Sequence, residues 1–305
     1  MNFIQQAYKG EPHFWKYLLP TLGLLSIFIL NSILISVLDL DSNELLRKSI
    51  LEKGANRVFF ENLVVFVVFL GGLFLWVRFV NKQSIISLST SRERIDLKRV
   101  VFSFSLWGII TASMIVYSYF DAPEDFVWNF KLHKFLVLAF LSILFLPIQT
   151  SFEEYFFRGY LMQGIGVLVK NKWIPLLVTS VLFGLMHLAN PEVDKLGPII
   201  MIYYIGTGLF LGIITLMDDG LELALGFHAA NNLVTALLVT SDWTAFQTDS
   251  LLLDISEPSA GLNVIVPVFI LFPILLFIFS KKYHWNNWKE KLLGKVVKPN
   301  AITND

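Results

Sequence analysis

Cysteine is absent from the 305 residues of the chain. Its absence excludes disulfide bridges, thiolate metal ligands, cysteine nucleophiles and S-acylation of the protein itself, so a metal site would have to use histidine and carboxylate side chains. Charge is also scarce: Asp, Glu, Lys and Arg make up 16% of the residues, and 24 basic residues balance 24 acidic ones. Without a basic field or an acidic tail, we expect no nucleic acid among the partners.

Apolar residues take the place of the missing charge. Hydrophobic residues make up 55% of the chain and the mean hydropathy is +0.64, well above an ordinary globular domain. Runs with little or no charge cover residues 17–38, 62–77, 100–120, 135–152, 173–189, 199–217, 221–240 and 264–280. We predict an all-α fold, a polytopic membrane helical bundle of about eight transmembrane helices. The first run is expected to be a spanning helix and not a cleavable signal, and no soluble domain is expected at either end.

Lysine and arginine are unevenly divided between the two sets of connections. An even number of spans places both termini on one side, whose connections carry 17 basic residues against seven on the other side. By the positive-inside rule, we expect both termini to be cytoplasmic and the protein to be integral to a plasma or inner membrane. Residues 84–99 mix apolar and basic side chains, as either an interfacial helix or a solvated loop does.

These features divide the chain into three parts. Residues 1–130 would hold the first three membrane helices and the interfacial segment 84–99. Residues 131–240 would form the catalytic core, with a polar cavity between the fourth, fifth and seventh helices. Residues 241–305 would supply an outer loop, the eighth helix and a basic cytoplasmic tail. In the sixth run, Gly208 and Gly212 form a small-xxx-small pair, which is typical of helix packing.

Glu153, Glu154 and Arg158 are three ionisable residues inside apolar sequence. One charged residue at the centre of a bilayer costs roughly 2.5 to 3.5 kcal/mol on insertion scales, so a cluster of them indicates a use. On a helix, Glu154 and Arg158 lie four residues apart on one face and can pair, whereas Glu153 points about a third of a turn away. The partners of Glu153 must therefore come from other helices.

Two of the five histidines also fall in apolar runs, His187 near the end of the fifth run and His228 in the seventh. Imidazoles in spans usually face a protein interior or water. His228 and Asn232 share a helical face, while Asn231 is expected to be turned aside. Each residue alone is more often an interhelical hydrogen-bond anchor than a catalytic group. As a set with the charged cluster, they need one another as partners.

The combination of Glu153, His187 and His228 supports two kinds of chemistry. A Glu and a His that activate water, beside donors for an oxyanion, hydrolyse amides or esters. The same three residues match the ligand set of catalytic zinc, which keeps one position open for water. The chain has no His-Glu-x-x-His pattern, which would place two zinc ligands one helical turn apart. A divalent metal such as zinc and a metal-free glutamate mechanism both stay open.

Three short motifs follow one another in the chain. They are Glu-Glu-x-x-x-Arg from Glu153 to Arg158, Phe-x-x-x-His from Phe183 to His187, and His-x-x-x-Asn from His228 to Asn232. In this order they resemble the motifs of the CPBP, or Abi, family of intramembrane proteases. That family includes the CAAX prenyl endoproteases and bacterial proteins linked to bacteriocin processing and immunity. The resemblance covers about residues 130–240.

The resemblance implies an intramembrane endopeptidase of a family named for metalloproteases. Glu153 with His187 would activate the attacking water, and His228 with Asn232 would stabilise the tetrahedral oxyanion. Supporting residues would be Glu154, Arg158 and Phe183. The implied partners are membrane lipid and a hydrophobic or lipid-anchored peptide or protein, CAAX-type prenylated substrates included. The alternatives are a non-enzymatic scaffold or bacteriocin-immunity protein, and a transporter or proton pathway, which the lack of an internal repeat disfavours.

The depth of the site constrains two helices. His187 lies about 21 Å from the cytoplasmic start of the fifth helix, at a rise of about 1.5 Å per residue. Glu153 reaches a similar depth only if the fourth helix continues past Pro147 toward Val169. We therefore predict a kinked or unusually long fourth helix, which an end at Arg158 would contradict. The seventh helix is expected to be tilted or to start deep.

Overall fold

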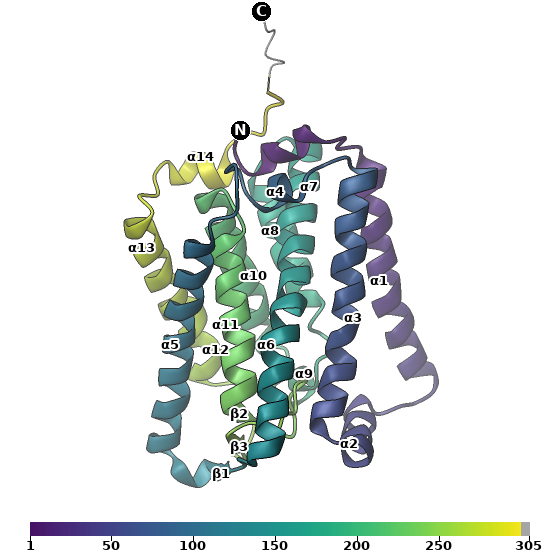
Figure 1. Cartoon of the computed structure of the whole chain (residues 1–305), viewed down its shortest axis with the longest axis vertical. Helices are drawn as coiled ribbons and strands as arrows, with labels where there is room; N and C mark the ends of the chain where they lie inside the picture. Colours follow the sequence, from purple (N-terminus) through teal and green to yellow (C-terminus); the bar gives the residue numbers. More distant parts are fainter. Residues whose placement is uncertain (300–305) are drawn as a thin grey trace, which may run out of the picture.

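Long helices that run side by side make up most of the molecule (Figure 1). The computed structural model describes residues 1–299. Within this range six helices are long and apolar enough to cross a membrane: Phe14–Ile35, Ala55–Val80, Leu97–Asp121, Leu132–Val169, Ile200–Asp218 and Val264–Lys282. The expected all-α polytopic bundle is confirmed. The other two expected spans correspond to shorter helices, α8 (Trp173–Leu185) and α11 (Glu222–Leu238).

The other helices follow the apolar runs and the connections between them. The longer ones are α1 (Phe14–Val37), α2 (Ser42–Lys53), α3 (Ala55–Leu75), α5 (Leu97–Asp121), α6 (Leu132–Glu154), α10 (Ile200–Asp218) and α13 (Phe272–Lys282). The shorter ones are α4 (Ile85–Ser89), α7 (Met162–Val169), α9 (Pro191–Leu196), α12 (Leu262–Val266), α14 (Trp288–Leu293) and the 3-10 turns Ile4–Lys9 and Pro123–Asp125. The π-helical segments Trp76–Val80, Tyr155–Leu161 and Pro267–Leu271 extend α3, join α6 to α7 and join α12 to α13.

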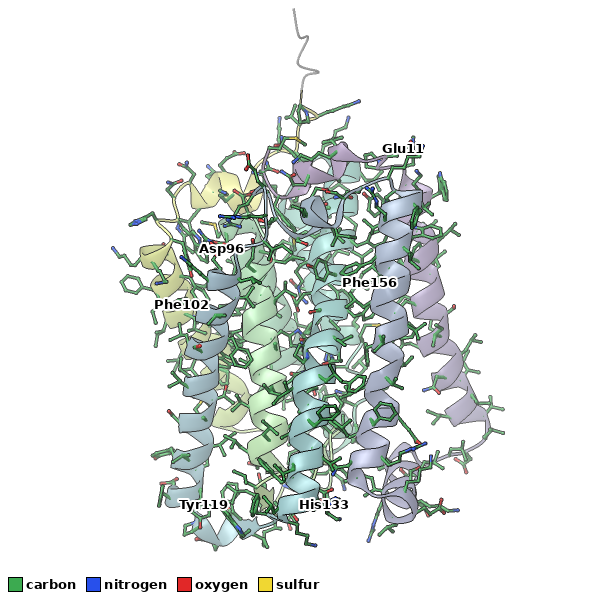
Figure 2. The ribbon with its side chains drawn as sticks, viewed as in Figure 1. Glu11, Asp96, Phe102, Tyr119, His133 and Phe156 are labelled. Atoms are coloured by element: carbon green, nitrogen blue, oxygen red, sulfur yellow. The ribbon has the colours of Figure 1, made fainter. Side chains whose placement is uncertain are left out.

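The two ends of the bundle carry different connections. The N-terminus lies at the same end as α4 and α14, whereas α2, α9 and three short strands lie at the opposite end (Figure 1). Glu11 and Asp96 lie toward the first end, and Tyr119 and His133 lie near the second (Figure 2). This arrangement places the N-terminal arm and the segment after α13 at one end, as the sequence predicts for an even number of passes.

A small sheet closes the end of the bundle opposite the N-terminus. Strand β3 (Leu252–Asp254) lies between β1 (Phe126–Trp128), with which it is antiparallel, and β2 (Val239–Thr240), with which it is parallel. Backbone hydrogen bonds of the sheet therefore hold residues 241–263, expected to form a loop, against the connection that leads into α6.

The fourth predicted helix is unusually long. Residues Leu132–Val169 form one apolar helical stretch of 38 residues, in which α6 passes through the π-helical segment Tyr155–Leu161 into α7. The helix does not end at Arg158, so the prediction of a long fourth helix is confirmed. A π-helical segment adds a residue to the turn, and such segments are frequent at functional sites. Here it begins directly after Glu154.

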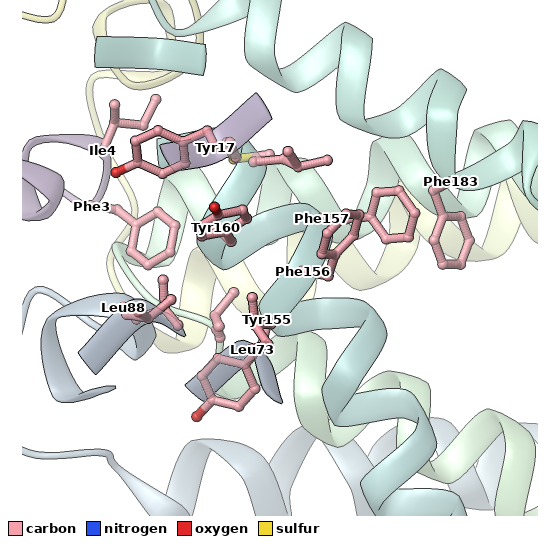
Figure 3. Packing of buried hydrophobic residues seen from close by; sticks show 14 of the residues in the cluster. Phe3, Ile4, Tyr17, Leu73, Leu88, Tyr155, Phe156, Phe157, Tyr160 and Phe183 are labelled. Carbon is pink, nitrogen blue, oxygen red and sulfur yellow. The ribbon is translucent and has the colours of Figure 1, made fainter. Parts of the chain in front are cut away.

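Aromatic side chains fix the π-helical segment in the bundle. All seven of its residues are buried, and Tyr155, Phe156, Phe157 and Tyr160 lie within one hydrophobic cluster (Figure 3). The ring of Phe157 meets that of Phe183 edge to face, with centroids 5.6 Å apart. Because these rings interdigitate with neighbouring elements, the segment cannot rotate without repacking the core.

Glycines allow α8 and α10 to approach closely. A Cβ atom added at Gly208 would lie 2.7 Å from the backbone oxygen of Ser180, and one added at Gly212 would lie 2.5 Å from a methyl carbon of Leu176. Both neighbours belong to α8, so the small-xxx-small pair serves helix packing, as its spacing predicts.

The segment 84–99 differs from the amphipathic surface helix that is one of its two sequence interpretations. Its helical residues are the short α4 and the first three residues of α5; Leu88 is fully buried, and Arg92 bridges Asp218 at 2.9 Å and Glu222 at 3.2 Å. The Glu222 side chain stands in the first turn of α11 and is 1% exposed. The segment therefore packs into the bundle and supplies the cations that the acidic ends of α10 and α11 require.

Candidate active site

The three sequence motifs converge on one cavity. Glu153 ends α6 with Glu154, Phe183 stands in α8, and His228 and Asn232 lie on α11. Glu153, Phe183, His187, His228 and Asn232 all line a cavity of 680 Å³. The structure thus brings together the residues that the sequence singles out, although they are separated by up to 79 positions along the chain.

Glu154 and Arg158 form the ion pair that their spacing predicts. Arg158 Nη1 donates to Glu154 Oε1 at 3.0 Å, and both side chains are fully buried. Arg158 Nη2 also donates to the backbone oxygen of Gly208 at 3.2 Å, and the guanidinium lies 4.2 Å above the ring of Phe183. The pair therefore joins α6 to α8 and α10, and the cation–π contact gives Phe183 its place in the second motif.

His228 lies between the two carboxyl groups. Its Nδ1 is 2.7 Å from Glu154 Oε1, and its Nε2 is 3.7 Å from Glu153 Oε2. Because an ionised carboxylate only accepts hydrogen bonds, the network assigns the Nδ1 hydrogen to the bond with Glu154. Glu154 thus accepts from Arg158 and His228 together and sets the orientation of the imidazole, whose other nitrogen faces Glu153.

Glu153 has one anchored oxygen and one free oxygen. Oε1 accepts from Gln149 Nε2, and Gln149 Oε1 accepts from Asn232 Nδ2 at 3.0 Å. Oε2 is buried and has no hydrogen-bond partner within residues 1–299. The bridge through Gln149 fixes the carboxylate and leaves Oε2 as an acceptor on the cavity wall. The sequence analysis did not single out Gln149, although its position four residues before Glu153 was a visible signal.

His187 lies beyond the end of α8 and not inside a spanning helix. The helix ends at Leu185, and His187 Nδ1 is 2.8 Å from the backbone oxygen of Phe183. A carbonyl oxygen can only accept, so Nδ1 carries the hydrogen and Nε2 is the acceptor in the neutral ring. The ring stacks on Tyr204 at 4.4 Å. In the described part of the chain, His187 shares the cavity with Glu153 but makes no hydrogen bond to it.

Asn231 is not turned aside, which corrects the expectation from helical spacing. Its Nδ2 donates to Asn232 Oδ1 at 3.1 Å, and its Oδ1 accepts from Trp107 Nε1 at 3.1 Å and from the Tyr203 hydroxyl at 3.4 Å. The physical reason is that α5 and α10 both pack against α11 and bring donors to this amide, which lines the same cavity as His228 and Asn232. The result is a chain of hydrogen bonds from α5 to Glu153.

The metal set that the sequence leaves open is not assembled in the described chain. Within residues 1–299, no three His, Asp or Glu side chains, Glu153, His187 and His228 included, form a group that could hold a metal ion. The donor types suit zinc, but their arrangement fits a metal ion poorly. The chemistry derived below therefore uses only the side chains of the chain.

The part of the chain that contains the three motifs resembles a known protein family. Residues 132–234 match the family model described as type II CAAX prenyl endopeptidase Rce1-like. This segment is similar to the Rce1-like family. The match runs from the start of α6 into α11 and includes every motif residue from Glu153 to Asn232. The resemblance stated from the three motifs is therefore confirmed.

One relative extends beyond the Rce1-like segment. The uncharacterized protein YyaK of Bacillus subtilis (strain 168) is 27% identical over 254 residues, which cover 79% of this chain and 83% of that protein. No solved structure matches the chain. Because this match is longer than the Rce1-like segment, part of the chain outside that segment also resembles the Bacillus subtilis protein.

Proposed function

We propose that the protein is an intramembrane endopeptidase that hydrolyses a peptide bond of a hydrophobic or membrane-associated substrate. The observation that carries the proposal is the free Oε2 of Glu153, which faces His228 Nε2 at 3.7 Å on the wall of the cavity. A carboxylate in this setting, next to an imidazole on the lining of a cavity, is suited to general-base catalysis. The Rce1-like match of residues 132–234 supports the same class of reaction.

The proposed reaction begins with a water molecule next to Glu153 Oε2. The carboxylate takes a proton from the water, whose oxygen attacks the carbonyl carbon of the scissile bond. His187 Nε2, unprotonated in the neutral ring, accepts a hydrogen bond from the same water and orients it. The carbon–nitrogen bond then breaks, and the proton held by Glu153 passes to the departing amine.

His228 and Asn232 stabilise the negative oxygen that forms during the attack. Glu154 holds Nδ1 of His228, so that Nε2 lies on the side of Glu153, where as an N–H it donates a hydrogen bond to the reacting oxygen. Asn232 uses one N–H on Gln149 and keeps a second N–H for the oxyanion. Glu154, Arg158 and Phe183 hold this arrangement and take no part in proton transfer.

The aromatic residues that line the cavity favour a hydrophobic substrate. Phe66 and Phe69 from α3, Phe152 from α6 and Phe227 from α11 line it together with the polar residues. An apolar chain, such as a lipid-anchored peptide of the CAAX type or a membrane helix end, suits such walls. We also propose that both termini are cytoplasmic, because the basic residues concentrate at their end of the bundle.

The proposal is tested by mass spectrometry of membrane peptides from cells that make the wild-type protein or the Glu153→Gln variant. Peptides that depend on the wild-type protein would identify the substrate and the cleaved bond. If cells with the wild-type protein and cells with the variant, at equal protein levels, contain identical sets of membrane peptides, the protease proposal is wrong and a scaffold is favoured. Activity of the purified protein should survive a zinc chelator, whereas a loss that zinc reverses would require a metal mechanism.

A further inference from the structure

A second carboxylate, Glu192, lines the same cavity as Glu153. It stands in α9, five residues after His187. Glu192 Oε1 accepts a hydrogen bond from the backbone nitrogen of Ala245 at 3.1 Å, whereas Oε2 is buried and has no hydrogen-bond partner among the described residues. One oxygen therefore holds the segment after α11, and the other stays available to a ligand.

The cavity offers Glu192 no lysine or arginine as a partner among the described residues. Of the described residues that line the cavity, none is lysine or arginine, and Glu153 and Glu192 are its carboxylates. Burial raises the pKa of Glu192, since desolvation disfavours the ionised form of a carboxyl group. A cation that entered the cavity would offset the cost of ionising Glu192 and form a charge-assisted hydrogen bond with its carboxylate.

The segment tied to Glu192 is acidic as well. Residues 241–263 contain Asp242, Asp249, Asp254 and Glu257 and no basic residue, and Ala245 of this segment is the partner of Glu192. Although Lys134 pairs with Asp249 at 3.3 Å, the segment as a whole favours the approach of a positively charged group.

We propose that Glu192 is a specificity residue that binds a cationic nitrogen of the peptide substrate, either a lysine or arginine side chain or a free N-terminus. This inference rests on the proposed peptidase function. Five residues of fully extended chain span at most about 18 Å, which bounds the separation of the His187 and Glu192 Cα atoms. A substrate in an extended conformation covers the same distance with the same number of residues. A cationic group bound at Glu192 therefore lies within about five residues of the bond that is cleaved near His187.

The two oxygens of Glu192 allow its structural contact to be separated from ligand recognition. In Glu192→Gln the side-chain carbonyl can still accept from the Ala245 nitrogen, while the negative charge is lost. Asp194→Asn removes an exposed charge from the same helix and serves as the matched control.

The experiment compares short acetylated leucine-rich peptides that carry one lysine, moved along the sequence, with peptides that carry norleucine instead. Wild-type and Asp194→Asn proteins in liposomes should cleave one lysine peptide about 10- to 150-fold better in kcat/KM than its norleucine counterpart. Glu192→Gln should lose this preference and still cleave the norleucine peptide. An equal preference in wild type and Glu192→Gln would overturn the proposal, and so would a wild type that prefers neither a lysine nor a free N-terminus.

Two further experiments identify which group of the peptide carries the bound cation and test the binding site independently of cleavage. If the higher kcat/KM appears instead with unacetylated norleucine peptides and depends on Glu192, the N-terminus is the bound group. Binding of fluorescent lysine and norleucine peptides to Glu153→Gln, with and without Glu192→Gln, tests the subsite without turnover. Glu192-dependent binding without any cleavage by the wild type would support the subsite while rejecting the peptidase. Equal binding of both peptides would reject the subsite.

Discussion

Glu154 accepts hydrogen bonds from Arg158 and His228 at once and thereby links the supporting ion pair to the proposed catalytic imidazole. A fully buried charge without its partner is costly, since it loses the solvation of water and gains nothing in return. The two acidic neighbours in the first motif thus have separate tasks: Glu154 holds the site, and Glu153 lines the cavity.

Arg158→Met should destabilise the folded protein by about 3 to 5 kcal/mol, because it leaves the Glu154 carboxylate buried without its cation. Unfolding in detergent with a chemical denaturant measures the loss. The double variant Glu154→Gln with Arg158→Met should regain part of the stability, since neither charge is then left unpaired. A single variant as stable as the wild type would contradict this account of the pair.

Gln149→Ala should lower kcat about tenfold or more and leave KM nearly unchanged, because Glu153 and Asn232 lose the amide that fixes them. The measurement is steady-state cleavage of the substrate found in the membrane-peptide experiment. The thermal unfolding temperature should change little, which distinguishes positioning from folding. A rise in KM alone would show that Gln149 contacts the substrate instead.

Helical spacing could predict contacts within one helix but not those between helices. The pair of Glu154 with Arg158 follows from a separation of four residues, and the structure contains it. The roles of Gln149, Asn231 and Glu192 depend on partners from other elements: Asn232 of α11 for Gln149, residues of α5 and α10 for Asn231, and the segment after α11 for Glu192. Tertiary packing determines these partners, and the spacing of residues within one helix does not predict it.

At the scale of elements, α6 and its continuation into α7 decide where the site lies. The stretch Leu132–Val169 was predictable in length, because Glu153 has to reach the depth of His187. The π-helical segment was not predictable, since its turn is fixed by the packing of its aromatic rings. The fifth run is apolar to residue 189, yet α8 ends at Leu185, because hydropathy does not mark the last hydrogen bond of a helix.

Gly208→Ala should destabilise the protein by about 1 to 3 kcal/mol, because the added methyl group meets the backbone of Ser180 at 2.7 Å. Gly71→Ala on α3 is the matched control, since nothing lies within 4 Å of its added Cβ. The control should be neutral or gain up to about 1 kcal/mol from helix propensity. Thermal unfolding of both variants in detergent measures the difference, and equal stabilities would contradict the close packing of α8 on α10.

At the scale of the whole molecule, hydropathy predicted the bundle well and its count of spans less well. Six helices have the length and composition of a membrane span in residues 1–299, and the shorter α8 and α11 occupy the remaining two runs. Both of the shorter helices carry or adjoin motif residues. Polar side chains that serve a site shorten the apolar run around them, which is why a count based on hydropathy is least certain there.

The absence of cysteine allows the proposed orientation to be tested by single substitutions. Lys289→Cys is exposed in α14, and Glu124→Cys is exposed next to β1, at the opposite end of the bundle. In intact cells a membrane-impermeant maleimide should label Glu124→Cys and leave Lys289→Cys unlabelled until the membrane is opened. The reverse pattern would show that the termini lie outside.

The most direct test of the central claim is the cleavage rate of purified Glu153→Gln in liposomes. Gln keeps the size of the side chain and its bond to Gln149 but cannot take a proton from water. We expect kcat/KM to fall by about 10²- to 10⁴-fold, while the unfolding temperature stays within the range of the wild type. A folded Glu153→Gln protein that cleaves at the wild-type rate would contradict the assignment of Glu153 as the base.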